Sequence, residues 1–377
     1  MIIPFFLMNR GCPQRCIFCN ERLTAGSRPG RITEEAFSTN VRAHLGKAGR
    51  SRASGQRPPQ IAFYGGTFTG MERPEQRRLL DLSRPFLQDG RVDGIRISTR
   101  PGGIDAEYLD DLKASGVKTV EVGAQSLDDR VLLSARRGHT EADVSRTIRL
   151  LKEKNLETGI HLMAGLPGDS PKRFAATVRK TIDLRPDMVR IHPTLILKDT
   201  PLAEIFQRGE YLPLSLPEAI DLCKDALKTF AGAGIPVIRL GLQTTREMEE
   251  PGAVVGGPFH PAFRSLVEAA LFLEMAVTLL SYVGGNDGNP EFSLLRNGSA
   301  VPRFAVSPAD ISGLRGQKNE NMASLKKHFH LQQIDIQSDV HLPRQTLVLT
   351  VNGKRLRTDF TGKIDICPAD SMNPWRR

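Results

Sequence analysis

The sequence predicts an α/β protein, in which a partial, open (β/α)6-type barrel is followed by a small C-terminal α+β accessory domain. Two observations predict this class. From residue 61 to about residue 240, short runs rich in Val and Ile alternate with stretches whose apolar residues recur at helical spacing, as in parallel sheets wound by helices. After about residue 245 this alternation stops, and a long apolar helix is followed by short strands. We therefore expect two domains, residues 1–245 and residues 246–377.

Seven short apolar segments are the predicted strands of the first domain. One stands at the N-terminus, and the other six alternate with loops and helical patterns. No Gly-x-Gly-x-x-Gly sequence follows a predicted strand, so an open barrel is favoured over a dinucleotide-binding Rossmann sheet. The predicted strands are Ile2–Leu7, Ile61–Tyr64, Gly94–Ser98, Thr119–Val122, Gly159–Met163, Met188–His192 and Pro236–Leu240.

Four amphipathic stretches between these strands are the predicted helices. In one of them Val144, Ile148 and Leu151 recur at the spacing of a single helix face. Residues 46–60, which are rich in Gly, Ser, Arg and Pro, are predicted to form a flexible basic loop. The predicted helices are Glu107–Ser115, Asp143–Lys154, Pro171–Asp183 and Leu216–Ala233.

The accessory domain is predicted from the change of pattern after residue 245. Its segment Gly252–Pro261 is rich in Gly and Pro and is interpreted as a linker or an active-site lid. Residues 312–319 are interpreted as a polar loop that caps a helix, with anion binding as the alternative. The predicted regular elements are the helices His260–Tyr282 and Lys318–Phe329 and the strands Ile334–Gln337 and Thr346–Val351.

Composition and charge favour a globular protein of the cytoplasm. No run of about 18 apolar residues is visible, so no membrane span is expected, and the apolar N-terminus is too short for a signal peptide. The chain of 377 residues has five cysteines, too few and too clustered for a disulfide scaffold of this size. The net charge of +10 favours an anionic partner such as RNA about as much as it favours a plain basic surface.

Three cysteines lie within eight residues, in the pattern Cys12-x3-Cys16-x2-Cys19. Thiolates are soft ligands that suit iron–sulfur clusters or zinc. Ferredoxin clusters of the [4Fe–4S] type use four cysteines, so three cysteines on one loop leave one iron open. A structural zinc site would need a fourth ligand, and the nearest candidate is His44, 25 residues beyond Cys19. The spacing therefore favours a [4Fe–4S] cluster with an open iron.

Six further motifs follow the cysteines in order, and together the seven resemble the radical S-adenosylmethionine (SAM) superfamily. The likeness covers residues 1 to about 245 and is strongest to the radical SAM core of the Elongator catalytic subunit and related bacterial proteins, with coproporphyrinogen dehydrogenases as more distant relatives. The six motifs are Tyr64–Thr69, Ile97–Pro101, Glu121–Ser126, Arg137–Thr140, His161–Pro167 and Arg190–Leu195.

The resemblance implies a [4Fe–4S] cluster and SAM as cofactors, with Cys12, Cys16 and Cys19 as the iron ligands. Glycines after the second strand let the backbone approach the methionine amine. Arg137 pairs with the SAM carboxylate or is a surface arginine, and Glu121 with Arg190 holds substrate or forms a buried ion pair; both pairs of alternatives stay open. The implied SAM contacts are Gly65, Gly66, Thr67, Ser98, Gln125, Arg137, His161 and Gly165.

The implied activity is that of a radical SAM enzyme. The cluster, reduced by a low-potential donor such as flavodoxin or ferredoxin, cleaves SAM to a 5′-deoxyadenosyl radical, which abstracts hydrogen from a substrate. A tRNA base is one candidate substrate, and a small metabolite or tetrapyrrole is the alternative. A non-catalytic, zinc-containing RNA-binding protein is the alternative from another class. We expect no acetyltransferase domain, because residues 246–377 show no glycine-rich acetyl-CoA signature.

Overall fold

The computed structural model describes the chain except residues 14, 27–29, 52–57, 285–294, 296–299 and 368–377. It divides into two compact units. The first comprises Met1–Ala219 and Ile235–Pro261, and the second comprises Ile220–Gly234 and Ala262–Arg377. The chain thus passes between the units three times, so the two units are not two consecutive halves of the sequence. The predicted boundary at residue 245 stays a prediction.

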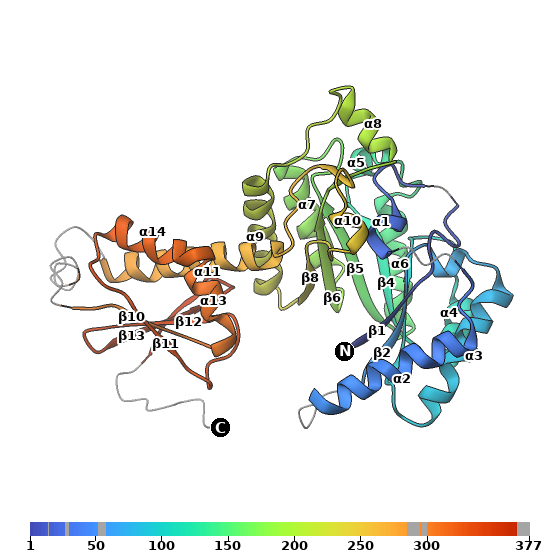
Figure 1. Cartoon of the computed structure of the whole chain (residues 1–377), viewed down its shortest axis with the longest axis horizontal. Helices are drawn as coiled ribbons and strands as arrows, with labels where there is room; N and C mark the ends of the chain where they lie inside the picture. Colours follow the sequence, from blue (N-terminus) through green and yellow to red (C-terminus); the bar gives the residue numbers. More distant parts are fainter. Residues whose placement is uncertain (14, 27–29, 52–57, 285–294, 296–299, 368–377) are drawn as a thin grey trace. The chain divides into compact units, whose positions relative to one another are not determined.

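The first unit is built on a seven-stranded sheet whose strands are all parallel, in the order β1-β2-β3-β4-β5-β6-β8 (Figure 1). The spatial order follows the chain order, because each βα unit adds its strand beside the preceding one. All seven predicted strands are present, and the sheet is that of an open (β/α) barrel. The strands are β1 Ile2–Phe6, β2 Gln60–Tyr64, β3 Gly94–Thr99, β4 Val117–Gln125, β5 Glu157–Ala164, β6 Met188–Pro193 and β8 Val237–Leu240.

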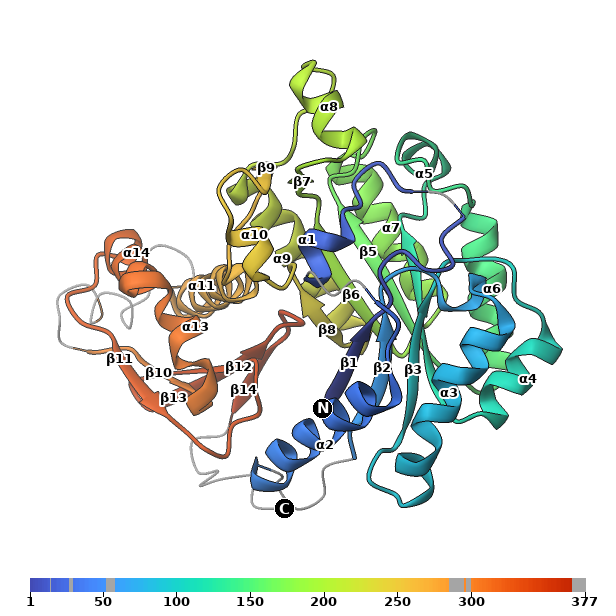
Figure 2. The ribbon, with the colours of Figure 1, turned by 45° about the vertical axis from the view of Figure 1, so that its right-hand side comes forward.

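Helices cover the sheet, and α3, α4 and α6 lie side by side along one of its faces (Figure 2). The reason is visible in α6: Thr140 and Asp143 form a capping box that starts the helix, and Val144, Ile148 and Leu151 are fully buried. The helices of this unit are α1 Glu21–Ala25, α2 Glu34–Ser51, α3 Arg73–Gln88, α4 Ala106–Ala114, α5 Asp129–Ser134, α6 Glu141–Glu153, α7 Pro171–Asp183, α8 Pro201–Gln207 and α10 Arg246–Glu249. Helix α9, Leu216–Gly232, begins in this unit and belongs to the second unit from Ile220 onward.

The predicted loop at residues 46–60 is wrong at both ends. Helix α2 continues to Ser51, and strand β2 begins at Gln60. Its two glycines cost a helix about 1 kcal/mol each relative to alanine, which the rest of an 18-residue helix outweighs. Residues 52–57 of the predicted loop lie outside the described residues.

The segment interpreted as a linker or lid contains a strand. Strand β9, Val254–Gly256, pairs antiparallel with β7, Ile196–Leu197. Ala253, just before it, is buried in an apolar cluster, and Gly257 lies so close to the backbone of residue 194 that a Cβ atom would meet its carbonyl oxygen at 2.8 Å. The segment is therefore packed into the first unit. The apolar cluster consists of Leu23, Leu195, Leu197, Met248 and Ala253.

The second unit is of the α+β class, as predicted. Helix α11 packs on the strands β12 and β13 and on the helices α13 and α14. The five strands have the order β11-β10-β12-β13-β14, and all pairs are antiparallel except β10 with β11. The elements are α11 Phe263–Gly284, β10 Arg303–Val306, α13 Ile311–Arg315, α14 Glu320–Phe329, β11 Asp335–Ser338, β12 Thr346–Val351, β13 Lys354–Asp359 and β14 Ile364–Cys367.

Helix α11 qualifies the expectation that no segment resembles a membrane span. In the described part of the chain it is the one helix long and apolar enough to cross a membrane. More than half of its apolar stretch is buried inside the unit, and the ring of Phe272 lies edge-on to that of Phe360 at 5.4 Å. These contacts are those of the core helix of an α+β unit.

Candidate active site

A cavity of about 740 Å³ lies in the first unit, where the cysteine loop meets the seven-stranded sheet. Parallel strands bring their carboxyl ends to one edge, so loops that follow different strands converge there. All of the predicted site residues line this cavity except Gly165. Those that line it are Cys12, Cys16, Cys19, Gly65, Gly66, Thr67, Ser98, Gln125, Arg137 and His161.

The cysteine loop is held against the turn after β2. Thr67 N donates to the Arg10 carbonyl at 2.8 Å, and Gly11 has a φ of +71°. A Cβ atom on Gly11 would meet Thr67 O at 2.2 Å, so only glycine fits at this crossing. The contact fixes where Cys12 stands relative to the sheet.

The three thiols stand in different surroundings. Arg137 Nη1 donates to Cys16 Sγ at 2.6 Å, and Cys12 Sγ lies 3.4 Å from Thr67 Oγ1. Burial raises the pKa of the Cys19 thiol to about 12 and also raises that of Cys12. Buried thiols of this kind become thiolates when a metal centre takes the place of the proton.

The three cysteines line one cavity without forming a tight site for a single metal ion. Among the described residues, no three His, Cys, Asp or Glu side chains are grouped closely enough to hold a single metal ion. His44, the candidate fourth zinc ligand, sits on α2 with its Nδ1 2.9 Å from Asn40 O, and it does not line the cavity. Three cysteines around one cavity suit a polynuclear cluster better than a zinc ion.

The glycine turn after β2 is held by a hydrogen bond to the carboxylate of Glu21. Glu21 Oε1 accepts from Gly66 N at 2.5 Å, and Glu21 Oε2 accepts from Asn9 N. Gly65 and Gly66 have φ of +77° and +63°, which favours glycine. Glu21 was not predicted, and its only signal in the sequence is that it follows Cys19 by two residues.

Gln125, at the end of β4, is held in an unusual conformation. Its φ is +69°, in the left-handed region that non-glycine residues seldom adopt. Its side-chain Oε1 is buried and has no partner in the described structure. An unsatisfied acceptor on the wall of a cavity indicates a missing hydrogen-bond donor, as a bound ligand would supply.

Arg137 is not the surface residue that one interpretation proposed. The exposed fraction of its side chain is 8%. Its Nη1 donates to Cys16 Sγ, and its Nη2 donates to the Gly123 carbonyl at 2.5 Å. Arg100 stabilises the same loop by donating to the carbonyls of Arg137 and Gly138 at 2.7 and 2.9 Å. The SAM carboxylate contact of Arg137 stays a prediction.

His161 forms a pair with His192, which the sequence did not single out. His161 Nε2 and His192 Nδ1 are 2.9 Å apart, with the rings edge to face. Burial lowers the pKa of His161 to about 3 and holds that of His192 well below its ordinary value, so both rings are neutral at pH 7. His192 Nε2 is buried without a hydrogen-bond partner in the described structure.

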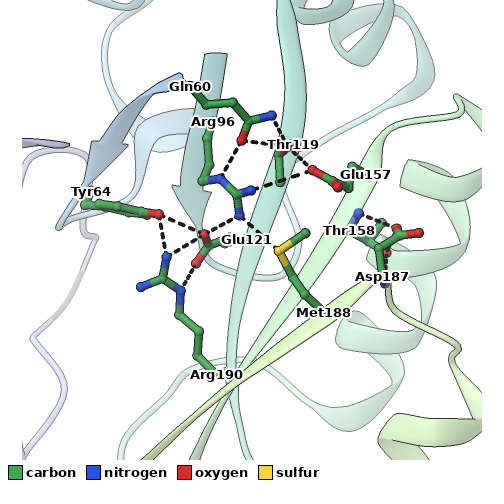
Figure 3. Close-up of polar contacts among 10 residues, drawn as sticks. All are labelled: Gln60, Tyr64, Arg96, Thr119, Glu121, Glu157, Thr158, Asp187, Met188 and Arg190. Atoms are coloured by element: carbon green, nitrogen blue, oxygen red, sulfur yellow. Dashed lines mark hydrogen bonds and ion pairs between the residues drawn. The ribbon is translucent and has the colours of Figure 1, made fainter. Parts of the chain in front are cut away.

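A charged network, drawn in Figure 3, joins side chains of several strands of the sheet. Glu121 Oε1 accepts from Arg96 Nη1 at 2.7 Å, and Glu121 Oε2 lies 2.6 Å from Arg190 Nε. The Tyr64 hydroxyl donates to the same carboxylate at 2.9 Å, and Arg96 also reaches Glu157 at 3.6 Å. Of the two alternatives for Glu121 and Arg190, the buried ion pair is the one observed, and Arg190 lines the cavity as well.

Gly165 lies off the cavity lining. Its φ is +78°, its carbonyl accepts from the Tyr211 hydroxyl at 2.6 Å, and its N–H donates to Asp169 at 3.1 Å. A Cβ atom there would meet the Leu214 side chain at 2.7 Å. The structure explains this glycine by packing, and its predicted contact with SAM stays a prediction.

Two family models match the chain. The model of the radical SAM superfamily matches residues 6–181, and the model of the radical SAM C-terminal domain matches residues 186–272. The chain belongs to the radical SAM superfamily. Like its family, this radical SAM protein is an enzyme whose cofactors are a [4Fe–4S] cluster and SAM, so the predicted family, fold class and cofactors are confirmed.

The radical SAM protein is similar to enzymes that act on tRNA and to Elongator proteins. It is 35% identical over 135 residues to the tRNA uridine(34) acetyltransferase of Methanocaldococcus jannaschii, across 35% of this chain and 25% of that enzyme. It is 33% identical over 132 residues to Elongator complex protein 3 of Saccharomyces cerevisiae, across 34% of this chain and 24% of that protein. The matched segments span about a quarter of these two curated relatives.

A solved structure shares the fold. The Elp3 protein of Methanocaldococcus infernus, with residues 1–46 deleted, superposes with a TM-score of 0.55 at 23% identity. The superposition covers 72% of this radical SAM protein and 62% of the archaeal chain. At this level of identity the likeness supports the fold alone.

Proposed function

We propose that this enzyme binds a [4Fe–4S] cluster through Cys12, Cys16 and Cys19 and modifies a nucleoside of tRNA by hydrogen abstraction. When bound and reduced by a low-potential donor such as flavodoxin or ferredoxin, the cluster supplies one electron to the sulfonium of SAM, which yields methionine and a 5′-deoxyadenosyl radical. The observation that carries the proposal is that three thiols of one loop line the same cavity as the glycine turn and Arg137.

The chain prepares the cysteine loop for a charged cofactor. Arg137 donates to Cys16 Sγ and Thr67 contacts Cys12 Sγ, so two ligands have polar neighbours beyond the metal. Gly11 fixes the loop against the β2 turn. The three cysteines would hold the cluster by three thiolates and would leave one iron open to a ligand.

The remaining lining residues provide the contacts for SAM. Gly65 and Gly66 expose backbone at the cavity beside the carboxylate of Glu21, and the Gln125 Oε1 acceptor lacks a donor that SAM would supply. Ser98, on β3, presents a hydroxyl for the ribose, and His161 presents a neutral ring on β5, two strands further along the sheet. Met163, Leu195 and Leu197 give the cavity an apolar stretch of wall.

A tRNA substrate is supported by similarity and by charge. The curated relatives named above include a tRNA uridine(34) acetyltransferase, matched over 135 residues. The net charge of +10 favours binding to a polyanion, and a base extruded from its stack can enter a cavity. We do not extend acetyl transfer to this enzyme, because the match spans a quarter of that relative.

A small anionic metabolite is the second candidate substrate. One observation favours it: among the described residues that line the cavity there are four arginines and two carboxylates. A cavity of this size encloses a small molecule as readily as a single nucleoside. The two candidates differ in whether hydrogen abstraction needs RNA.

Deuterium transfer tests the proposal. The reconstituted enzyme is incubated anaerobically with SAM, dithionite and bulk tRNA from cells grown in D₂O, and 5′-deoxyadenosine is analysed by mass spectrometry. Abstraction from tRNA adds one mass unit to 5′-deoxyadenosine in the wild type, and Cys16→Ala yields none. Formation of 5′-deoxyadenosine without deuterium, at a rate that nuclease treatment of the tRNA leaves unchanged, would reject tRNA as the substrate and retain the radical chemistry.

A further inference from the structure

A row of nitrogen donors crosses three neighbouring strands on the wall of the cavity. His161 on β5 is in register with Arg190 on β6, and Arg190 is in register with Arg239 on β8. Residues in register on parallel strands point to the same face of the sheet, and all three side chains line the cavity. None of the three comes from the cysteine loop or the glycine turn, so the row belongs to a different wall.

The row carries a positive charge that the described residues do not neutralise. Arg190 is matched by Glu121, and Arg96 reaches both Glu121 and Glu157. No carboxylate in the described part of the chain pairs with Arg239, whose Nη2 donates to Gln243 Oε1 at 3.1 Å. The carboxylates of Glu121 and Glu157 thus pair with Arg96 and Arg190, and the guanidinium group of Arg239 has no described ion pair.

Arg239 is partly buried and stands beside a like charge. Two like charges opposite each other on adjacent strands repel, and burial as well as Arg190 lowers the pKa of Arg239. Glu121 acts on the pKa of Arg239 in the opposite sense, but the same carboxylate already pairs with Arg96 and Arg190. The neutral His161–His192 pair, next to Arg190, adds a donor or acceptor without adding charge.

We infer that Arg239 and Arg190, with the His161–His192 pair beside them, form a subsite for an oxyanion of the substrate, a phosphate or a carboxylate. The inference rests on the proposed function, since it describes the substrate of the same cavity. Guanidinium groups bind both kinds of oxyanion through paired N–H donors. A phosphate would come from the backbone of a nucleotide whose base enters the cavity, and a carboxylate from a small acid.

Equilibrium dialysis tests the subsite without using turnover. The cluster-loaded protein, saturated with SAM under anaerobic conditions, is dialysed against inorganic phosphate, UMP or malonate, with uridine as the neutral comparison. The variants are Arg239→Met, which removes the charge, and Arg239→Lys, which retains it. The matched control is Arg149→Met, because Arg149 is an exposed arginine on α6 whose described contact is the Ser145 carbonyl at 3.3 Å.

The subsite predicts that at least one anion binds more tightly than uridine. Arg239→Met should weaken that anion at least about tenfold, Arg239→Lys should weaken it less, and Arg149→Met should leave it unchanged. Preference for UMP identifies a nucleotide phosphate, and preference for malonate identifies a carboxylate. The inference is wrong if no anion binds better than uridine or if Arg239→Met leaves the affinity unaltered. Because SAM cleavage is not the readout, failure here is separate from failure of the proposed function.

Discussion

Arg137 and Cys16 are 121 residues apart in the chain, and Arg137 Nη1 donates to Cys16 Sγ at 2.6 Å. The contact joins the loop after α5 to the cysteine loop, and Arg137 is held in place by its second hydrogen bond to the Gly123 carbonyl. A positive charge and a hydrogen bond at a ligand sulfur favour the electron-rich state of an iron–sulfur cluster. Arg137 is therefore placed to tune the cluster whether or not it also binds SAM.

Replacing Arg137 should lower the reduction potential of the cluster. We expect Arg137→Met to shift it by roughly −60 mV, a tenfold change for a one-electron couple. Arg137→Lys, which keeps the charge, should shift it less. The potential is read from a redox titration followed by electron paramagnetic resonance without SAM. Equal potentials in wild type and Arg137→Met would show that the contact does not influence the cluster.

Removing the buried carboxylate of Glu121 should destabilise the first unit. Glu121→Gln leaves Arg190 without its charge partner and Arg96 with only the more distant Glu157, and loss of one member of a buried pair costs about 3–5 kcal/mol. Asp81→Asn is the matched control, because Asp81 and Arg84 form an exposed pair worth about 0–1 kcal/mol. Urea denaturation followed by circular dichroism gives both free energies of unfolding, and similar losses would contradict the buried network.

The two glycines after β2 should differ in their tolerance of alanine. A Cβ atom on Gly66 would meet Arg10 O at 2.3 Å and Arg10 N at 2.8 Å, whereas one on Gly65 would come no closer than 3.4 Å to the Glu21 side chain. Both residues have positive φ, so that strain is shared. Gly66→Ala should therefore cost about 1–3 kcal/mol more than Gly65→Ala. Urea denaturation and the iron content after reconstitution measure the difference, and equal effects would argue against the close crossing with the cysteine loop.

The His161–His192 pair should make the protein acid-sensitive. Burial and the nearby Arg190 lower the pKa of His161 to about 3, below the ordinary value near 6.5. Its neutral form is thus favoured in the fold, and its stabilising contribution is complete above pH 6.5 and lost as the pH falls towards 3. His161→Gln should flatten the fall in the free energy of unfolding between pH 6.5 and 4. His330→Gln, at an exposed histidine, should leave that slope as in the wild type; the same slope in all three proteins would refute the expectation.

Much of the fold could be predicted because βα units have local signals. Each strand of the first unit is a short apolar run, and helices such as Pro171–Asp183 have a proline start and a regular apolar face. The loop predicted at residues 46–60 is wrong at its ends, because helix α2 continues through two glycines to Ser51 and strand β2 begins at Gln60. Helix α9 contributes residues to both compact units, which no local pattern indicates.

Sequence spacing could predict the residues of the candidate site that lie in contiguous motifs. It could not predict the residues that contact partners distant in the chain. The cysteines and the glycine turn are contiguous motifs. Glu21, His192 and Arg239 matter through partners distant in the chain, as Glu21 does through Gly66 and His192 through His161. A single charged or polar residue in a strand gives no sign of what the neighbouring strand places beside it.

The most direct test of the central claim is the release of 5′-deoxyadenosine. The protein is purified anaerobically, reconstituted with iron and sulfide, and supplied with SAM and dithionite, with Cys16→Ala as the control. We predict that the wild type forms a four-iron cluster and releases 5′-deoxyadenosine and methionine, and that Cys16→Ala does neither. A wild type that binds zinc, assembles no four-iron cluster and releases no 5′-deoxyadenosine would contradict the proposed role of the cysteine loop.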